Sequence, residues 1–311
     1  PMGSQAVFVL GALGSKLGGT LGGVIAMRAV VLFAEGATLL LLPRLLTAMG
    51  QPQRGVLLYA LHPLPMVEGV AGLHLEPVML ALGLLALLLA VRGRWWAGGL
   101  AYAASVALKL IPLVLAPLLV LRLAQIKSWR WALGLAAGVG AVLVLLHAPV
   151  LPSFLARGGQ SAALFWHTFE FNASVYYLLR EAGMALLCYN PIRMLGPVLA
   201  LATLLGCLAL AGWGRASRQQ ALQAAVASGL LYLLLTPTVH PWYLIPWLGL
   251  GVLAGLWTPL VWASAAFLSY AAYTQAGVVV PWPWLWAEYG LVAAALAYDL
   301  QWQAIFMRKT S

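Results

Sequence analysis

A histidine between two prolines lies in a polar turn that separates two apolar segments, in the run Leu233-Leu-Leu-Thr-Pro-Thr-Val-His-Pro-Trp-Tyr243. Because proline cannot continue a helix and pushes the preceding residue out of the α region, Pro237 and Pro241 are expected to hold His240 at a fixed bend. A titratable side chain between membrane segments is a candidate functional residue. An ordinary interfacial turn is the alternative, since Trp242 and the tyrosine after it also fit an aromatic belt.

Three further polar groups stand out in a chain with few charges: the run Gly72-Leu-His-Leu-Glu76, Lys109 inside an apolar segment, and the stretch from Asn172 to Arg180. Lysine and arginine stabilise phosphate oxygens as a leaving group departs, and a carboxylate can deprotonate an attacking hydroxyl. Each residue alone has an ordinary explanation, because a loop glutamate is usually only solvated and a membrane lysine can snorkel to the interface. Together they predict a site for an anionic phosphate with an acid–base group beside it.

The composition places the chain in a membrane. Of its 311 residues 63% are hydrophobic and 8% are charged, and the mean hydropathy is +0.94, well above that of soluble domains. Apolar runs long enough to cross ~30 Å of hydrocarbon recur along the sequence. The predicted fold class is therefore all-α, a polytopic bundle of transmembrane helices. The two cysteines, Cys188 and Cys207, give neither a disulfide framework nor a zinc spacing.

The net charge of +10 reflects orientation in a membrane rather than binding to nucleic acid. In the topology that the apolar runs predict, most lysines and arginines fall on one side, which the positive-inside rule makes cytoplasmic. These are Arg44, Arg54, Arg92, Arg94, Arg122, Lys127, Arg130, Arg215, Arg218, Arg308 and Lys309. The acidic residues lie mainly at the opposite face. We therefore expect the functional polar groups outside and the C-terminus inside the cell.

The predicted spans alternate in direction along the chain. They are 20–43, 55–73 with a break near its prolines, 76–91, 131–148, 194–213, 219–236, 241–257, 259–277 and 284–306. The stretch 149–193 is too polar to cross and too aromatic for a plain linker, which predicts an external interfacial helix with loops. Residues 95–121 carry basic clusters at both ends, so they predict a re-entrant pair of half-length helices with the turn at Lys109.

The whole sequence is expected to form a single transmembrane domain, residues 1–311. It opens at Pro1 on the predicted outer side, with no signal peptide and no first span before it. We therefore expect an N-terminal helix and a first external loop to precede this sequence.

Four motifs, in order along the chain, resemble those of the C-type superfamily of multispanning glycosyltransferases (GT-C), in particular its bacterial mannosyltransferase-like branch. Leu61-His-Pro-Leu through Glu68 and then Gly72-Leu-His-Leu-Glu76 are similar to its His-Pro-Leu and Gly-x-His-x-Asp/Glu patterns. Lys109 to Pro112 resembles its Lys-x-x-Pro step, and Phe171 to Tyr176 its Phe-Asn-x-Ser-x-Tyr motif. The most specific match is Pro237 to Tyr243, which resembles Pro-Thr-x-His-Pro-Trp-Tyr.

The resemblance implies a transferase that moves one sugar, mannose or another hexose, from a polyprenyl-phosphate donor to a glycan or lipid acceptor. The reaction would take place at the outer face of a bacterial inner membrane. On this interpretation Lys109, His240 and Arg180 hold the donor phosphate, and Glu76 with His74 activates or positions the acceptor. The sugar and lipid groove would be lined by Asn172, Tyr176, Trp242 and Tyr243. No metal ligands are assigned, and a requirement for a divalent metal stays open.

A lipid or solute transporter, or a non-catalytic membrane subunit, is the alternative function. Secondary transporters commonly have broken helices at the midplane in both halves of the chain. The sequence offers one broken hairpin, at Lys109, without an evident counterpart. This favours the transferase, whose sugar, acceptor and protein partners the sequence leaves unidentified.

Overall fold

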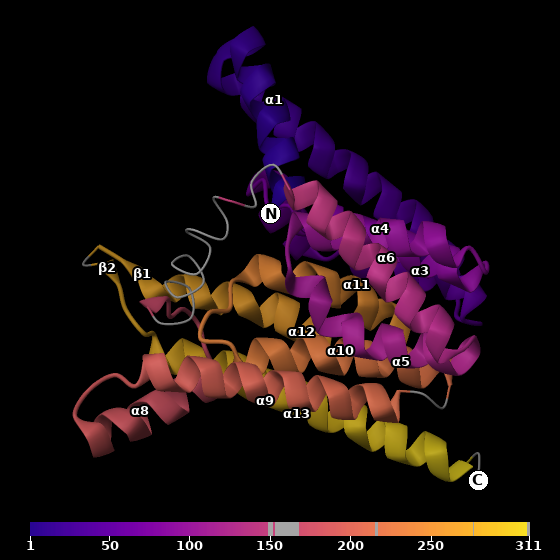
Figure 1. The fold of residues 1–311 in the computed structure, drawn as a ribbon. Coiled ribbons are helices and arrows are strands. Elements are labelled where there is room, and N and C mark those ends of the chain that lie inside the picture. Colours follow the sequence, from indigo (N-terminus) through magenta and orange to yellow (C-terminus); the bar gives the residue numbers. More distant parts are fainter. Residues whose placement is uncertain (149–151, 153–167, 215–216, 276, 310–311) are drawn as a thin grey trace.

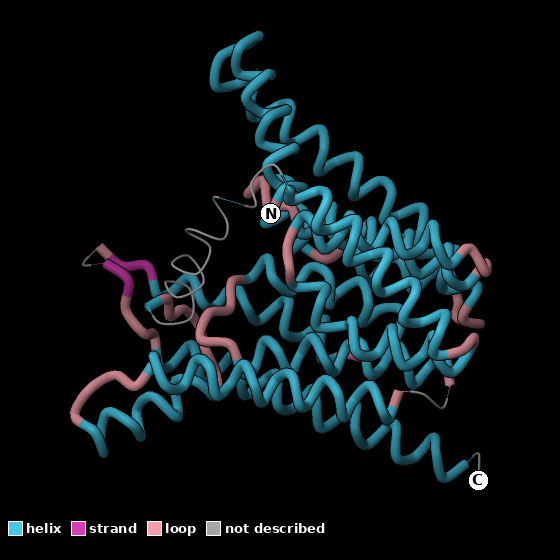
Figure 2. The backbone as a smooth tube through the Cα atoms, viewed as in Figure 1, coloured by secondary structure: helices cyan, strands magenta, loops and turns pink. Residues whose placement is uncertain are grey.

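The computed structural model is a bundle of helices, and it describes residues 1–148, 152, 168–214, 217–275 and 277–309 (Figure 1). Helices form nearly all of its regular structure, and the connecting loops gather at two opposite ends of the bundle (Figure 2). The predicted all-α class is confirmed.

The first element, α1 (Met2–Ala48), is a helical hairpin that projects from the bundle (Figure 1). The helix breaks at Gly19, whose φ of 62° glycine adopts without a steric penalty. Two further glycines let the arms touch, because a Cβ added at Gly22 would lie 2.3 Å from the carbonyl oxygen of Gly14. The predicted span 20–43 lies in the second arm.

The next segment carries the break predicted near its prolines. It comprises η1 (Gln53–Gly55), α2 (Val56–Ala60), the π-helical turn η2 (Pro65–Ala71) and α3 (Glu76–Val91). The axes of η2 and α3 are bent by 109°. Leu73, with a φ of 59°, lies in the turn between them. This turn places His74 and Glu76 at the start of α3.

The break predicted at Lys109 is confirmed: the segment forms α4 (Trp95–Leu108), η3 (Ile111–Leu115) and α5 (Ala116–Ile126). That the pair is re-entrant in a membrane stays a prediction. Between α4 and η3 the backbone of Lys109 is extended, with φ −149° and ψ 147°. The hydroxyl of Tyr102 donates a hydrogen bond of 2.8 Å to the carbonyl of Pro112 across the turn. The Lys127 ammonium lies 5.8 Å from the ring of Trp95, so the segment begins and ends at the same end of the bundle.

Four helices of the middle of the chain follow. They are α6 (Trp129–His147), α8 (Val175–Leu187), α9 (Ile192–Trp213) and α10 (Arg218–Leu235). Serine side chains accept hydrogen bonds from backbone N–H groups at the starts of α6 and α10, as good N-caps do. Helix α8 falls within the stretch predicted to hold an external interfacial helix, and it exposes several leucines. The predicted loop residues 149–151 and 153–167 lie outside the described part of the chain.

The last third contains shorter elements before a final long helix. They are η5 (Pro241–Leu244), α11 (Ile245–Ala254), α12 (Thr258–Ala265), η6 (Ala266–Ala272), the antiparallel strands β1 (Tyr273–Thr274) and β2 (Gly277–Val278), and α13 (Trp282–Lys309). The spans expected at 241–257 and 259–277 are thus shorter helices. One reason is that Gly255 ends α11 in the left-handed conformation, with φ 66°.

By length and composition, three described helices could cross a membrane: α1, α6 and α9. The bent pair of η2 and α3 raises this number to four if it counts as one span. Several candidate spans in one chain are the mark of a multi-pass membrane protein.

The largest core cluster joins the elements that carry the candidate residues. Leu84 of α3, Leu233 of α10 and Trp247 of α11 are all fully buried in it. The Trp247 ring packs directly on Gly229, where an added Cβ would lie 2.2 Å from the ring. This close packing fixes α11 against α10 and so sets the position of the His240 turn between them.

Candidate active site

The centre of the candidate site is an ion pair between Lys109 and Glu76. Lys109 follows the last residue of α4, and Glu76 is the first residue of α3, so two helix ends bring the charges together. The Glu76 side chain is 0% exposed, whereas that of Lys109 is 29% exposed. The ammonium therefore has a free side, while the carboxylate is enclosed.

This pairing changes the argument for Lys109. The sequence predicted that an anionic ligand offsets its charge, but in the structure Glu76 supplies the opposite charge. Lysine carries three N–H donors, however, and Glu76 accepts from it through one oxygen. A second anion can therefore still share the exposed side of the ammonium.

Beside the ion pair, four aromatic rings form a continuous stack. Trp242 lies between two histidines, with ring centroids 3.7 Å from His74 and 4.3 Å from His240. His240 in turn stacks on Phe171 at 4.7 Å. Tyr243 meets His240 edge-on at 5.4 Å and lies 5.6 Å from the Lys109 ammonium. The stack thus connects to the ion pair through Tyr243.

Backbone pairing holds the loop of Phe171 against the His240 turn. The N–H of Phe171 donates to the carbonyl of Pro237 at 3.1 Å, and the N–H of Val239 donates to the carbonyl of Phe171 at 2.8 Å. These bonds form a parallel bridge between Phe171 and Thr238. The segment between Pro237 and Pro241, where a bend was predicted, therefore also pairs like a short strand, and this pairing orients His240.

The sequence reasoning missed the partners of His74. The Nε2 atom of His74 lies 3.8 Å from Glu68, whose carboxylate accepts a hydrogen bond of 2.6 Å from the hydroxyl of Tyr270. Glu68 is largely buried, and His74 is 28% exposed. A partly exposed imidazole can accept a proton, and the Glu68 carboxylate 3.8 Å away would stabilise the imidazolium that forms. The acidic residue eight positions before Glu76 was the available signal.

Two predicted residues lie in a different cluster. Arg180 donates to Glu170 and Glu181, and Tyr176 donates to Glu170 at 2.6 Å. Burial raises the pKa of Glu170, but hydrogen bonds from Tyr176, Asn190 and Arg180 outweigh it and hold the pKa below its usual value. The predicted phosphate-binding role of Arg180 therefore lacks support, because its guanidinium is committed to carboxylates.

The four predicted groove residues also fall partly inside and partly outside the central cluster. Tyr176 is 0% exposed and supports Glu170, so it does not line a groove. Asn172 follows Phe171 at the edge of the ring stack, but its amide donates to Glu288 at 3.0 Å. Trp242 and Tyr243 do lie in the central cluster. Of the nine candidates, the structure thus joins His74, Glu76, Lys109, His240, Trp242 and Tyr243.

Among the described residues, no group of three or more His, Cys, Asp or Glu side chains is arranged to hold a metal ion.

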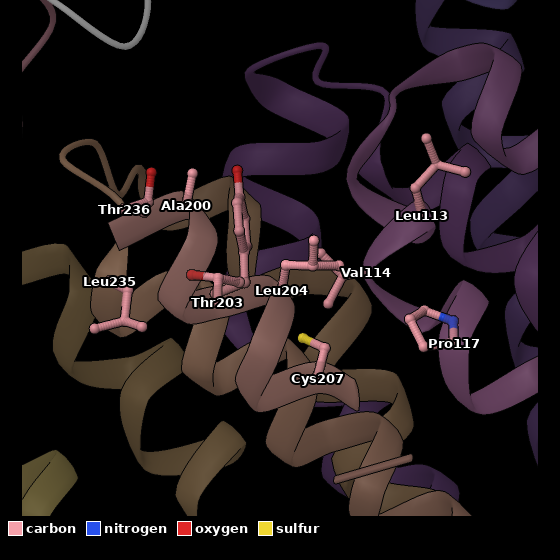
Figure 3. Close-up of a pocket in the computed structure, with 10 residues that line it drawn as sticks. Leu113, Val114, Pro117, Ala200, Thr203, Leu204, Cys207, Leu235 and Thr236 are labelled. Atoms are coloured by element: carbon pink, nitrogen blue, oxygen red, sulfur yellow. The ribbon is translucent and has the colours of Figure 1, made fainter. Parts of the chain in front are cut away.

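An apolar cavity of about 250 Å³ opens near this cluster (Figure 3). One wall comes from η3 and α5, and the other from α9 and the end of α10. The lining residues are Leu113, Val114, Pro117, Ala200, Thr203, Leu204, Cys207, Tyr232, Leu235 and Thr236. Leu113 and Leu204 are exposed at its mouth, so it opens sideways from the bundle. Tyr232 of the lining packs against the same core cluster as Tyr243, which places the cavity beside the central cluster.

The fold and the site together define a multi-pass membrane protein with a charged centre and an apolar cavity beside it. Residues 6–125 match the model of the MptA/B family, described as alpha-(1->6)-mannopyranosyltransferase, N-terminal domain. This part of the chain is therefore similar to a mannosyltransferase family, as the resemblance in the sequence predicted. The match includes His74, Glu76 and Lys109 and ends before His240. Comparison with curated proteins and with solved structures gave no match.

Proposed function

We propose that the chain transfers mannose from a polyprenyl-phosphate donor to a hydroxyl group of an acceptor, at the outer face of a bacterial cytoplasmic membrane. The observation that carries the proposal is the position of the Lys109 ammonium. It lies between the enclosed carboxylate of Glu76 and the cluster of His240 and Tyr243, next to an apolar cavity that opens sideways. In a polyprenyl-phosphate donor, the phosphate would pair with the Lys109 ammonium and the prenyl tail would fit the apolar cavity.

In this mechanism the acceptor hydroxyl oxygen forms a bond to C1 of the mannosyl group. The bond between C1 and the phosphate oxygen breaks, and its electron pair leaves with the polyprenyl phosphate. The exposed side of Lys109 stabilises the charge that grows on that phosphate. His240, held by its proline-flanked turn, offers a ring nitrogen to the same phosphate.

The proton of the acceptor hydroxyl passes to His74, with Glu68 behind it stabilising the imidazolium that forms. Glu76 then has a positioning role, because it is enclosed and bound to Lys109. The prenyl tail lies in the apolar cavity of Figure 3, which reaches the surface of the bundle at the exposed Leu113 and Leu204. The transporter alternative has no need of a base aligned in this way.

The decisive experiment distinguishes the effect of the two charges on turnover from their effect on folding. Lys109→Ala alone would leave Glu76 buried without a partner, which is costly for stability. The double variant Lys109→Gln with Glu76→Gln keeps two hydrogen-bonding side chains of similar size and removes both charges. We expect it to remain folded and to lose about 10²- to 10³-fold in turnover of mannosyl polyprenyl phosphate.

The single variant Lys109→Arg should retain part of the turnover, since it keeps a cation in place. Turnover is measured as radiolabelled mannose transferred by protein in nanodiscs, and folding as the thermal transition. A folded double variant with wild-type turnover would show that the ion pair is only structural. Facilitated lipid or solute flux without transfer would support the transporter instead.

A further inference from the structure

A second cavity, of about 230 Å³, lies between the loop that carries Phe171 and the region of η6 and β2. It is lined by Glu170, Phe171, Asn172, Tyr177, Arg180, Ser269, Ala272, Val278, Val279, Val280 and Pro281. Val278 and Val279 of the β2 region are exposed and form its rim. Its volume is below the ~300–1,000 Å³ of sites for drug-sized ligands, so it suits one small ring.

Two polar atoms of the lining are left without a partner among the described residues. They are the Oδ1 atom of Asn172 and the Oγ atom of Ser269. Both residues are more than nine-tenths buried, at 5% and 2% exposed. A buried polar group without a hydrogen bond costs about 1–3 kcal/mol, so a ligand that bonds to it gains affinity. The backbone of Asn172 is also left-handed, with φ 48°, as is common at functional positions.

The charges of the lining cancel each other. Arg180 forms an ion pair with Glu170, and Tyr176 and Asn190 also donate to that carboxylate. An anionic or cationic ligand would therefore meet no unpaired charge in the cavity. A neutral ligand with several hydroxyl groups fits better, because hydroxyls both donate to Asn172 Oδ1 and exchange hydrogen bonds with Ser269. The apolar rim of Val278 and Val279 suits the C–H surface of a sugar.

We propose that this cavity binds one hexose ring of an acceptor glycan, at the unit next to the one whose hydroxyl reacts. The inference rests on the proposed function and adds a binding site for the acceptor. The stacked rings of Phe171, His240 and Trp242 separate the cavity from His74. The 6-hydroxyl whose oxygen attacks C1 of the donor mannose, and whose proton passes to His74, therefore belongs to the terminal unit. Phe171 lines the cavity and stacks on His240 at 4.7 Å, so a hexose there lies one ring away from the donor site.

The test uses protein in nanodiscs, with α-(1→6)-mannobiose as the acceptor, so that one unit can react while the other lies in the cavity. Ala272 is buried and lines the cavity, so Ala272→Leu fills the space that the ring would occupy. Ser269→Ala removes a single hydroxyl. The matched control is Ser228→Ala, an equally buried serine whose hydroxyl already donates to the carbonyl of Ala224.

We expect Ala272→Leu to raise the KM for the acceptor by at least about tenfold, and Ser269→Ala by about three- to tenfold. The donor KM and the hydrolysis of donor without acceptor should stay unchanged in both, and Ser228→Ala should match wild type. A change in donor KM with an unchanged acceptor KM would overturn the inference. Unchanged constants for Ala272→Leu would overturn it as well.

A second readout separates this inference from the proposed function. Saturation-transfer NMR detects binding of methyl α-D-mannopyranoside without any transfer reaction. Binding by wild type that is lost in Ala272→Leu supports the hexose site even if mannosyl transfer fails. Transfer activity combined with equal mannoside binding by wild type and Ala272→Leu rejects the hexose site and leaves the donor site standing.

Discussion

The rings of Phe171 and His240 lie face to face, with centroids 4.7 Å apart and planes inclined by 24°. This contact joins the loop before α8 to the turn before η5, and the backbone bonds of Phe171 reinforce it. On our proposals, the donor lies on the His240 side and one hexose unit of the acceptor lies on the Phe171 side. The stack is therefore the wall that both substrates share.

Replacing this wall should affect both substrates at once. Phe171→Ala removes a buried aromatic ring, which typically costs about 3–5 kcal/mol of stability. We expect Phe171→Leu, which keeps more volume, to fold but to lower kcat and raise the acceptor KM several-fold. Steady-state kinetics at saturating donor measure both constants. A folded Phe171→Leu protein with wild-type constants would contradict the shared-wall interpretation.

Acid should weaken the cluster around Glu170. Because its folded pKa lies below the usual value, Glu170 contributes stability above its unfolded pKa of about 4.3, and this is lost as the pH falls through the folded pKa. We expect the Tm of wild type to fall more steeply below about pH 4.3 than that of Glu170→Gln. Glu181→Gln is the control, since Glu181 is more exposed. Parallel curves for wild type and Glu170→Gln would argue against this assignment.

Filling the apolar cavity should discriminate between donors by tail length. Ala200 lines the cavity on α9, so Ala200→Phe narrows it. We expect the KM for a long polyprenyl donor to rise about tenfold, because about two methylene groups lose their contacts, at about 0.8 kcal/mol each. A donor with a short prenyl chain should be affected less. Leu201→Phe, on the exposed face of the same helix, serves as the control. Equal effects on both donors would exclude this cavity as the tail site.

The orientation can be tested with a cysteine that the chain already has. Cys188 is exposed at the end of α8, whereas Cys207 is buried. We expect an impermeant maleimide added to intact cells to label Cys188, which lies on the predicted outer side. In a Cys188→Ser background, Arg54→Cys should become labelled only after the cells are opened. Labelling of Arg54→Cys in intact cells would reverse the topology.

Local features of the sequence were good guides to the fold. The break at Lys109 could be predicted from the sequence, because Pro112 lies three residues after it and basic clusters flank the segment at both ends. The break between α2 and η2 followed from Pro63 and Pro65 in the same way. The number of long spans was harder to predict, because residues such as Gly255 end helices through backbone conformations that composition does not encode.

The site was predictable only in part. The set His74, Glu76 and Lys109 came together because helix ends placed them there, and the polar residues were rare enough to notice. The roles of Arg180 and Tyr176 could not be read correctly, since they depend on Glu170 in the preceding loop rather than on any spacing along α8. The pairing of Phe171 with the His240 turn is formed by backbone bonds, which leave no trace in the residue types.

The first turn of α1 rests directly on the backbone that leads to Lys109. Ser4 donates a hydrogen bond to the carbonyl of Leu108, and a Cβ added at Gly3 would lie 2.8 Å from the carbonyl oxygen of Ala107. A larger residue at position 3 would therefore displace the backbone of Ala107 and Leu108, and with it Lys109, although position 3 contacts no substrate. In a library screened for altered turnover, Gly3 should score like an active-site residue, although no inspection of the pocket would select it.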